Sequence, residues 1–169
     1  MVKDYTVGKK RQFGKTTLGK AEKWLVEAAK KAGLDIGDFE HETTNDFVSH
    51  VMNRHGNEAI ESARSQVAIK SMDFGRIPEI VMDPDYVMVG ARRKNEDIVI
   101  YAKKMEDGTA FYIEEILRGN HNRTLRGKTM YKRKGNIDEK MFETLAGQNG
   151  KTDLTKAKIV VGRGRPFPR

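Results

Sequence analysis

The chain has 169 residues and no cysteine, which suits one domain with a sizeable core and excludes a large multidomain enzyme, a disulfide scaffold and a cysteine nucleophile. No apolar run approaches the roughly 20 residues of a membrane helix, and the N-terminal residues contain no secretion signal. The 32 basic and 24 acidic residues give a net charge of +8, which favours a polyanionic partner, most often nucleic acid.

The first 82 residues predict helices after a basic arm over residues 1–17, which has no apolar period. The apolar spacing of residues 18–32 fits one face of a helix that Gly33 ends. Thr44 can cap a second helix, which ends at Gly56 and whose apolar residues 47, 48, 51 and 52 share one side. A third helix is expected over residues 57–67, and Pro78 suits the first turn of a short helix that ends at Met82.

From residue 86 the apolar period changes to two, which indicates strands. We predict strands over residues 86–89, 98–104, 110–117 and 125–133, with a tight turn over residues 106–109 (EDGT) that carries the Asp-Gly signal. A last helix is expected over residues 137–146, before a basic and flexible tail over residues 147–169. The sequence therefore predicts a single α+β domain over residues 18–146, in which N-terminal helices pack on a small antiparallel β-sheet.

The spacing of the histidines argues against a metal site. His50 and His55 are five residues apart, whereas two ligands on one helix need a separation of three or four. His50 shares a helix face with Asp46 and Arg54, which a salt-bridged surface explains as well as a functional site does. His55 precedes Gly56 at the expected helix end, where it is either a capping residue or a proton donor favoured by the helix dipole.

The densest basic segment is residues 118–134, which contains seven lysines or arginines and no acid. A charge run of this kind is usually a solvated face. Its composition adds chemistry to the charge, because cations can hold phosphate, Tyr131 can stack on a base or donate its hydroxyl, and His121 can transfer a proton. The segment therefore predicts contact with single-stranded RNA along one face of a strand.

Five segments occur in an order that resembles a known family. They are residues 50–56 (HVMNRHG), 77–81 (IPEIV), 83–86 (DPDY), the hairpin strands within 98–117, and residues 128–132 (KTMYK). Over residues 43–134 the chain thus resembles the phage-associated Barnase/EndoU/colicin/RelE-like (BECR-fold) nuclease domains. The resemblance implies a BECR-like RNase fold and a metal-independent endoribonuclease without a cofactor, used as a toxin or effector in bacterial conflict.

In enzymes of this kind the ribose 2′-hydroxyl attacks the adjacent phosphorus, and a 2′,3′-cyclic phosphate forms. The resemblance implies His55, with His50 second, as general acid and base, and Lys128 as the cation that neutralises the transition state. It implies Thr129 and Tyr131 as hydroxyls directed at the phosphate and His121 as the reserve proton-transfer group. The residues that would hold the RNA backbone are Arg118, Arg123, Arg126, Lys132 and Arg133.

The resemblance also implies partners: RNA, such as tRNA, as substrate, and an acidic immunity or antitoxin protein as inhibitor. No membrane partner is expected, and action would take place in the cytoplasm of a host or target cell. Two other functions fit the same basic surface. One is a non-catalytic nucleic-acid-binding module of a phage or mobile element with a decayed nuclease fold, and the other is an adaptor for an acidic protein. RNA cleavage in the presence of a chelator would distinguish the endoribonuclease from these two other functions.

Overall fold

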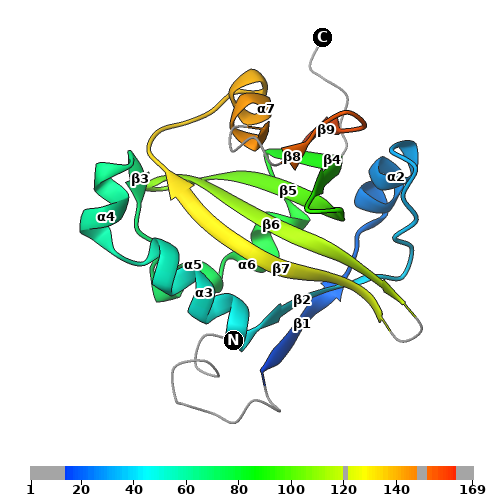
Figure 1. Cartoon of the computed structure of the whole chain (residues 1–169), viewed down its shortest axis with the longest axis horizontal. Coiled ribbons are helices and arrows are strands. Elements are labelled where there is room, and N and C mark those ends of the chain that lie inside the picture. Colours follow the sequence, from blue (N-terminus) through cyan, green and yellow to red (C-terminus); the bar gives the residue numbers. More distant parts are fainter. Residues whose placement is uncertain (1–13, 120–121, 148–151, 163–169) are drawn as a thin grey trace.

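A nine-stranded sheet forms the centre of the structure, a computed structural model that describes residues 14–119, 122–147 and 152–162 (Figure 1). The strands are β1 Lys15–Lys20, β2 Glu40–Thr44, β3 Gln66–Val67, β4 Tyr86–Arg93, β5 Glu96–Met105, β6 Gly108–Gly119, β7 Asn122–Arg133, β8 Thr152–Asp153 and β9 Lys158–Val161. The helices around them are α2 Lys23–Lys31, α3 Asn45–His55, α4 Glu58–Ala63, α5 Ser71–Phe74, α6 Ile77–Met82 and α7 Glu139–Gly147. None of these helices is both long and apolar enough to span a membrane.

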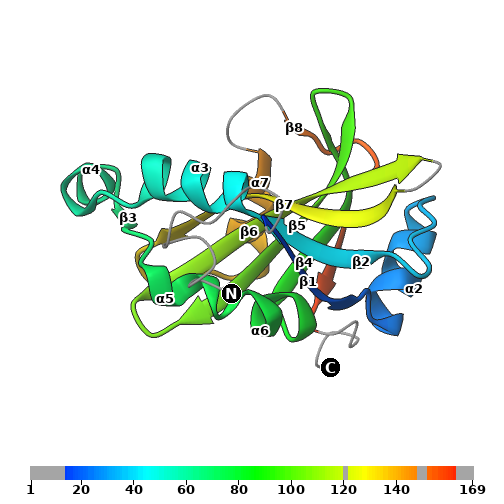
Figure 2. The same cartoon turned by 90° about the horizontal axis from the view of Figure 1, so that it is seen from below.

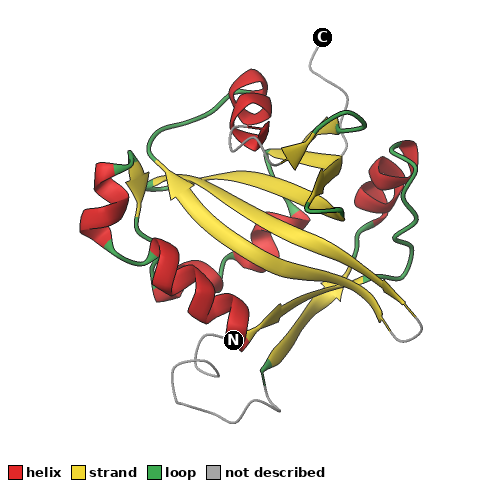
Figure 3. Ribbon diagram, in the orientation of Figure 1, coloured by secondary structure: helices red, strands yellow, loops and turns green. Residues whose placement is uncertain are grey.

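The sheet is mixed, in the order β1-β2-β7-β6-β5-β4-β8, with β3 added to β7 and β9 to β4 (Figure 3). β2 runs parallel to β7, whereas the other paired strands of the described residues are antiparallel. The turn predicted over residues 106–109 is confirmed: Glu106 and Asp107 join β5 to β6, which begins at Gly108. Only glycine fits there, because its φ is +153° and a Cβ would collide with the Arg133 carbonyl.

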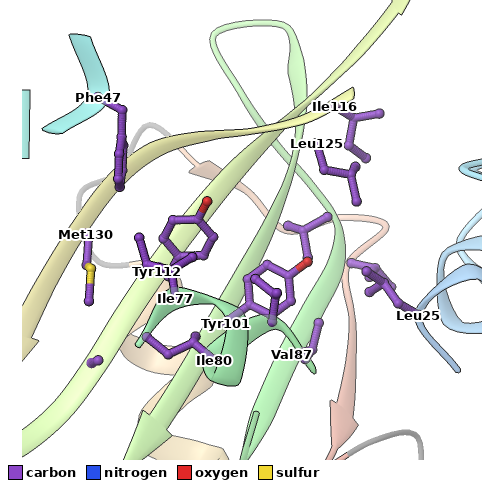
Figure 4. Close-up of a cluster of buried hydrophobic side chains, with 14 of the residues drawn as sticks. Leu25, Phe47, Ile77, Ile80, Val87, Tyr101, Tyr112, Ile116, Leu125 and Met130 are labelled. Carbon is purple, nitrogen blue, oxygen red and sulfur yellow. The ribbon is translucent and has the colours of Figure 1, made fainter. Parts of the chain in front are cut away.

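The two faces of the sheet carry separate apolar clusters, because side chains alternate along each strand. One face presents Val87, Tyr101 and Tyr112 to helices α2, α3, α5 and α6 (Figure 4). The opposite face presents Met88 and Phe111 to α7. Among the described helices, α7 therefore packs on a different side of the sheet from the others.

A buried polar group links three strands inside the first cluster. Glu114 of β6 has no exposed surface, and it accepts a 2.6 Å hydrogen bond from the Tyr101 hydroxyl of β5. His41 of β2 lies 2.6 Å from the same carboxylate through Nδ1. Burial, followed by the charge of Glu114, raises the pKa of Tyr101 well above its ordinary value. These bonds attach β2 to the central strands in the otherwise apolar core.

The predicted second helix is confirmed as α3, and its ends follow local sequence signals. The Thr44 hydroxyl accepts a 3.1 Å hydrogen bond from the amide of Phe47. At the other end, the Gly56 amide donates a hydrogen bond to the carbonyl of Met52. Phe47, Val48 and Val51 are buried. The short helix that begins near Pro78 and ends at Met82 is confirmed as α6.

The expected fold class, N-terminal helices on a small antiparallel sheet, is wrong. The sheet is large and mixed, and two N-terminal strands, β1 and β2, flank helix α2. β2 could not be predicted from the sequence, because its two buried residues, His41 and Thr43, are polar. A period-two hydrophobic pattern is therefore missing where the strand lies.

Other boundaries also differ from the expectation. The helix predicted over residues 18–32 begins only at Lys23, because Leu18 belongs to β1, and the helix predicted over 57–67 is limited to α4. The segment expected as a flexible tail contains β8 and β9, which pair with β4. Residues 1–13 of the expected arm and residues 163–169 of the tail lie outside the described part of the chain.

Candidate functional site: a basic cavity

A cavity of about 480 Å³ opens on the face of the sheet that α7 covers. Its ionisable lining among the described residues is basic, with two histidines, five lysines or arginines and no aspartate or glutamate: His50, Arg54, His55, Arg93, Lys94, Lys128 and Arg133, with Tyr131 beside them. Its other lining residues are Gln66, Ile100, Ile113, Thr129, Leu145, Ala146 and Thr152. We call this site the basic cavity.

A bulge in β7 places Lys128 and Thr129 in the basic cavity together. Thr129 pairs with Ile113 and Gly127 pairs with Glu114, so Lys128 is an extra residue between two adjacent pairs. Neighbouring side chains of a regular strand point to opposite faces, whereas a bulge can direct two neighbours to one side. The irregularity therefore brings an ammonium and a hydroxyl to the same surface.

Gly127, next to the bulge, allows α3 to approach β7. A Cβ at this position would lie 2.7 Å from the Tyr112 hydroxyl and 3.3 Å from the ring of Phe47, which belongs to α3. Phe47, which is 3% exposed, therefore occupies the space next to Gly127 that a side chain would need. Figures 1 and 2 show α3 alongside β7, with its C-terminal end toward β3. This close packing puts both histidines of α3 at the rim of the basic cavity.

His55 is held by a buried carboxylate. Its Nδ1 lies 3.2 Å from Oε2 of Glu61 in α4, and the side chain of Glu61 has no exposed surface. Because Nδ1 is directed at this carboxylate, Nε2 is the ring nitrogen left for a ligand. Sequence reasoning missed Glu61, because it lies in an acidic segment that reads as solvated surface and no helix period connects it to His55.

His50 is in a positive environment. Its partial burial and the charges of Arg54, His55 and Lys128, in this order, lower its pKa below the ordinary value of 6.5. The neutral imidazole is therefore favoured near neutral pH, and neutral imidazole can accept a proton. Arg54, which shares the expected Asp46–His50–Arg54 helix face, lines the cavity together with His50.

Lys128 is held by two carboxylates that are not among the lining residues of the cavity. Its Nζ lies 3.0 Å from Glu115 and 3.3 Å from Glu96. Burial tends to lower the pKa of Lys128, but the hydrogen bonds and charges of Glu115 and Glu96 outweigh it and raise the pKa. The ammonium is therefore charged at neutral pH and has a defined position, as electrostatic stabilisation of a developing anion requires.

Tyr131 is packed against two protein rings. Its ring is stacked on Phe111, with centroids 5.0 Å apart and planes 3° apart, and lies 5.7 Å from the ring of His55. These neighbours argue against stacking of Tyr131 on an RNA base. Burial raises the pKa of Tyr131, although Arg133 and Arg93 oppose the shift, so its hydroxyl is protonated and can donate a hydrogen bond.

The structure brings together five of the residues expected to be catalytic, His50, His55, Lys128, Thr129 and Tyr131, but only one of those expected to hold RNA, Arg133. Arg118 and Arg123 line a second cavity of about 1010 Å³ near the β6–β7 turn, where Asp97 pairs with Arg118 at 3.1 Å. Arg126 pairs with Glu42 at 3.0 Å. His121 lies outside the described residues.

Lys132 is the clearest departure from the expected RNA-binding set. Its side chain is 1% exposed, and its ammonium lies 2.9 Å from Asp73 and 2.7 Å from Asp107. The hydrogen bond and charge of Lys132 lower the pKa of Asp107, although burial opposes this shift. A buried cation with two acidic partners is part of the internal structure and cannot reach RNA at the surface, so this expectation is wrong.

Sequence reasoning missed several residues of the basic cavity. Arg93 is the last residue of β4, Lys94 lies in the turn that follows it, and Gln66 comes from β3, the short strand in which it pairs with Arg133. The consecutive basic residues at 92–94 were a visible signal for the first two. No local signal identified Gln66. Among the described residues, no three histidine, aspartate or glutamate side chains gather as they would to hold a metal ion.

Comparison with known proteins agrees with the resemblance noted in the sequence. Residues 19–140 match the family described as phage-Barnase-EndoU-ColicinE5/D-RelE like nuclease, so the match covers more than half of the chain and extends beyond residues 43–134 at both ends. No curated protein and no solved structure matches the chain. The chain belongs to the phage-Barnase-EndoU-ColicinE5/D-RelE like nuclease family.

Proposed function

We propose that this nuclease-family protein is a metal-independent endoribonuclease that cleaves RNA by transphosphorylation. The observation that supports the proposal most strongly is the lining of the basic cavity, which contains two histidines, Lys128 and two hydroxyl groups, with no aspartate or glutamate among its described lining residues. Imidazoles can transfer protons near neutral pH, and fixed cations stabilise the charge that develops on phosphorus. These groups correspond to the proton-transfer and charge-stabilising roles that transphosphorylation needs.

In the proposed mechanism His50 is the general base and His55 the general acid. Neutral His50, whose pKa is lowered, takes the proton of the ribose 2′-hydroxyl, and the 2′-oxygen forms a bond to the adjacent phosphorus. The bond from phosphorus to the 5′-oxygen breaks, and that oxygen receives a proton from His55. Protonated His55 would have the buried Glu61 carboxylate as counter-ion, 3.2 Å away. The products are a 2′,3′-cyclic phosphate and a 5′-hydroxyl.

The other lining groups act on charge and position. Lys128 neutralises the transition state, and Tyr131 and Thr129 donate hydrogen bonds to the phosphate oxygens. Arg54, Arg93 and Arg133 hold phosphates on either side of the cleaved bond. Positively charged side chains far from the cavity, such as Arg118 and Arg123, take no part in the chemical step.

The proposal is tested by incubating the protein with total RNA and bulk tRNA in EDTA. The expected result is cleavage that EDTA does not abolish, with fragments that end in a 2′,3′-cyclic phosphate. An oligonucleotide with one 2′-deoxy substitution should resist cleavage at that position only, because the nucleophile is missing there. Intact RNA, EDTA-sensitive cleavage, or cleavage at the 2′-deoxy position would each contradict the proposal.

A second candidate function is nucleic-acid binding without catalysis. One observation favours it: Lys128 is already paired with Glu96 and Glu115, and it must share its charge between these partners and a substrate phosphate. This function predicts RNA binding whose affinity falls linearly with salt on logarithmic axes, with no new RNA termini. The RNA experiment in EDTA separates the two candidates.

The biological role that we propose is that of a toxin inhibited by an acidic protein. A cavity whose described lining has five lysines or arginines and no aspartate or glutamate is electrostatically complementary to such an inhibitor. Expression in a bacterium is expected to stop growth, and co-expression of a small acidic inhibitor should restore it. Equal growth of cells that express the protein and cells that express a variant unable to cleave RNA would contradict the toxin role.

A further inference from the structure

The basic cavity has two chemically different parts. One part carries the histidines and the lysine and arginine side chains, and the other is formed by four apolar residues, Ile100, Ile113, Leu145 and Ala146. Ile100, Ile113 and Ala146 belong to one buried apolar cluster, and Leu145 packs against it while half-exposed. We call these four residues the apolar wall.

The apolar wall is adjacent to the catalytic groups, across neighbouring strands. Ile100 of β5 pairs with Ile113 of β6, and Ile113 pairs with Thr129 of β7. Neighbouring strands lie about 5 Å apart. Ile100 is therefore about two strand spacings from Thr129, and Ile113 is about one spacing from it. A ligand whose phosphate contacts Lys128 would therefore hold its next chemical group against the wall.

A phosphate group alone would fill only the cationic part of the cavity. A volume of about 480 Å³ is in the range of small-molecule pockets, which combine an apolar lining with a few polar groups, roughly 300–1,000 Å³. In RNA the flat group with apolar faces next to each phosphate is the nucleobase. RNA-binding proteins usually stack bases on aromatic rings, but Tyr131 already contacts Phe111 and His55. The aliphatic wall is the surface that remains for a base.

We propose that the apolar wall is a subsite for one unpaired nucleobase, the base of the nucleotide whose phosphate is cleaved. This inference rests on the proposed function and adds a substrate class to it, because a base inside a duplex is stacked on its neighbours and cannot pack on the wall. The preferred substrate is therefore single-stranded RNA or a loop.

Part of the apolar wall lies beyond the residues that match the family. Leu145 and Ala146 belong to α7, which extends from residue 139 to residue 147, whereas the family match ends at residue 140. Ile100 and Ile113 lie within the matched residues, so α7 supplies two of the four side chains of the wall. Leu145 is the half-exposed one among the four.

The test compares the binding of three probes by calorimetry: inorganic phosphate, ribose 3-phosphate and nucleoside 3′-monophosphates. The expected result is that at least one nucleotide binds about tenfold or more tightly than ribose 3-phosphate, the ratio that an apolar pocket typically gives. Leu145→Ser should reduce this ratio about fivefold or more, with unchanged phosphate affinity, because it removes most of the exposed part of the wall. Met141→Ser is the matched control, since Met141 is in the same helix and 45% exposed but does not line the cavity.

Equal affinities of the nucleotides and ribose 3-phosphate would overturn the subsite, as would equal effects of Leu145→Ser and Met141→Ser. No binding of any probe would overturn it as well. These results are independent of RNA cleavage, so the two proposals can fail separately. A protein that cleaves RNA but does not distinguish a nucleotide from ribose 3-phosphate keeps the proposed function and loses the subsite. One that distinguishes them but leaves RNA intact keeps the subsite as a binding site only.

Discussion

Two lysines of β7 show that position, rather than charge, decides what a basic residue does. Lys128 lines the basic cavity with its ammonium held by Glu96 and Glu115 and is partly exposed. Lys132, four residues later, is 1% exposed and lies between Asp73 and Asp107. The bulge at Lys128 separates the two environments.

The two lysines therefore predict opposite effects of the same substitution. Lys128→Met should lower RNA cleavage about 100-fold or more, because a charge that stabilises the transition state is lost. It should change the free energy of unfolding by less than about 1 kcal/mol, as is usual for a partly exposed ion pair. Lys132→Met should lower the free energy of unfolding by about 3 kcal/mol, because Asp73 and Asp107 lose the buried cation.

Urea unfolding and a single-turnover cleavage assay measure both effects. Each variant is the control for the other, since the substitution and the strand are the same. If Lys128→Met destabilised the protein as much as Lys132→Met, or cleaved RNA as fast as the wild type, the role of Lys128 in the cavity would be wrong.

The environment of His50 makes a prediction about pH. Its pKa is below 6.5, so the unprotonated base is lost only as the pH falls through that lowered value, and the acidic limb of kcat/KM should lie below pH 6.5. Arg54→Gln removes a positive charge that lowers this pKa. The acidic limb should then move to higher pH, by less than about one unit because water and salt screen an exposed charge.

The control for this pH profile is Lys20→Gln, which removes an exposed charge of β1 that does not line the basic cavity. The same acidic limb as in the wild type is expected for this variant. A limb above pH 6.5 in the wild type, or one that Arg54→Gln leaves in place, would rule out His50 as the general base.

At the scale of elements, the contact between α3 and β7 positions the two histidines. Gly127→Ala would place a Cβ 2.7 Å from the Tyr112 hydroxyl and 3.3 Å from Phe47, so α3 must move away. We expect a loss of about 1–3 kcal/mol in the free energy of unfolding, typical of an overpacked core, together with slower cleavage. Gly119→Ala is the control, because the nearest atom to its Cβ is 3.9 Å away. Unchanged unfolding and cleavage in Gly127→Ala would show that this contact does not position α3.

Elements with strong local signals could be predicted from the sequence. Thr44 and Gly56 mark the ends of α3, Pro78 marks α6, and Gly108 marks the β5–β6 turn. The pairing of β2 with β7 could not be predicted, because a parallel pair between distant segments has no local signature and its buried residues are polar. These are tertiary effects, which local propensity does not encode.

The candidate site also contains features that the sequence predicts and features that depend on tertiary packing. Lys128, Thr129, Tyr131 and the two histidines, which were selected through the resemblance rather than through periodicity, line one cavity. The burial of Lys132 and the support of His55 by Glu61 depend on packing between separate elements. A charge count along the chain cannot distinguish a buried cation from an exposed one.

At the scale of the whole molecule, the C-terminal segment completes both the core and the site. Phe142 of α7 is fully buried against the face of the sheet that carries Phe111 and Met88, and β9 pairs with β4. The family match ends at residue 140, yet the part of the chain that follows covers this apolar face. A chain limited to the matched residues would expose it to water.

Truncation after Asp138 is therefore expected to abolish cooperative unfolding and to produce binding of the dye ANS, which reports exposed apolar surface. Phe111 and Met88, which are 0% and 1% exposed, would become accessible. Truncation after Gly162 is the control, because it retains α7, β8 and β9, and it should unfold like the full chain. Cooperative unfolding of the shorter chain without ANS binding would show that the chain folds without α7, β8 and β9.

The central claim is that the basic cavity is an active site, and the most direct measurement is the single-turnover rate of RNA cleavage by His55→Asn. Asparagine can still donate a hydrogen bond to Glu61 but cannot transfer a proton. The account predicts a rate about 10²–10⁴-fold below that of the wild type, the usual effect of losing a general acid, with a free energy of unfolding within about 1 kcal/mol of it. Cleavage at the wild-type rate by this folded variant would contradict the account.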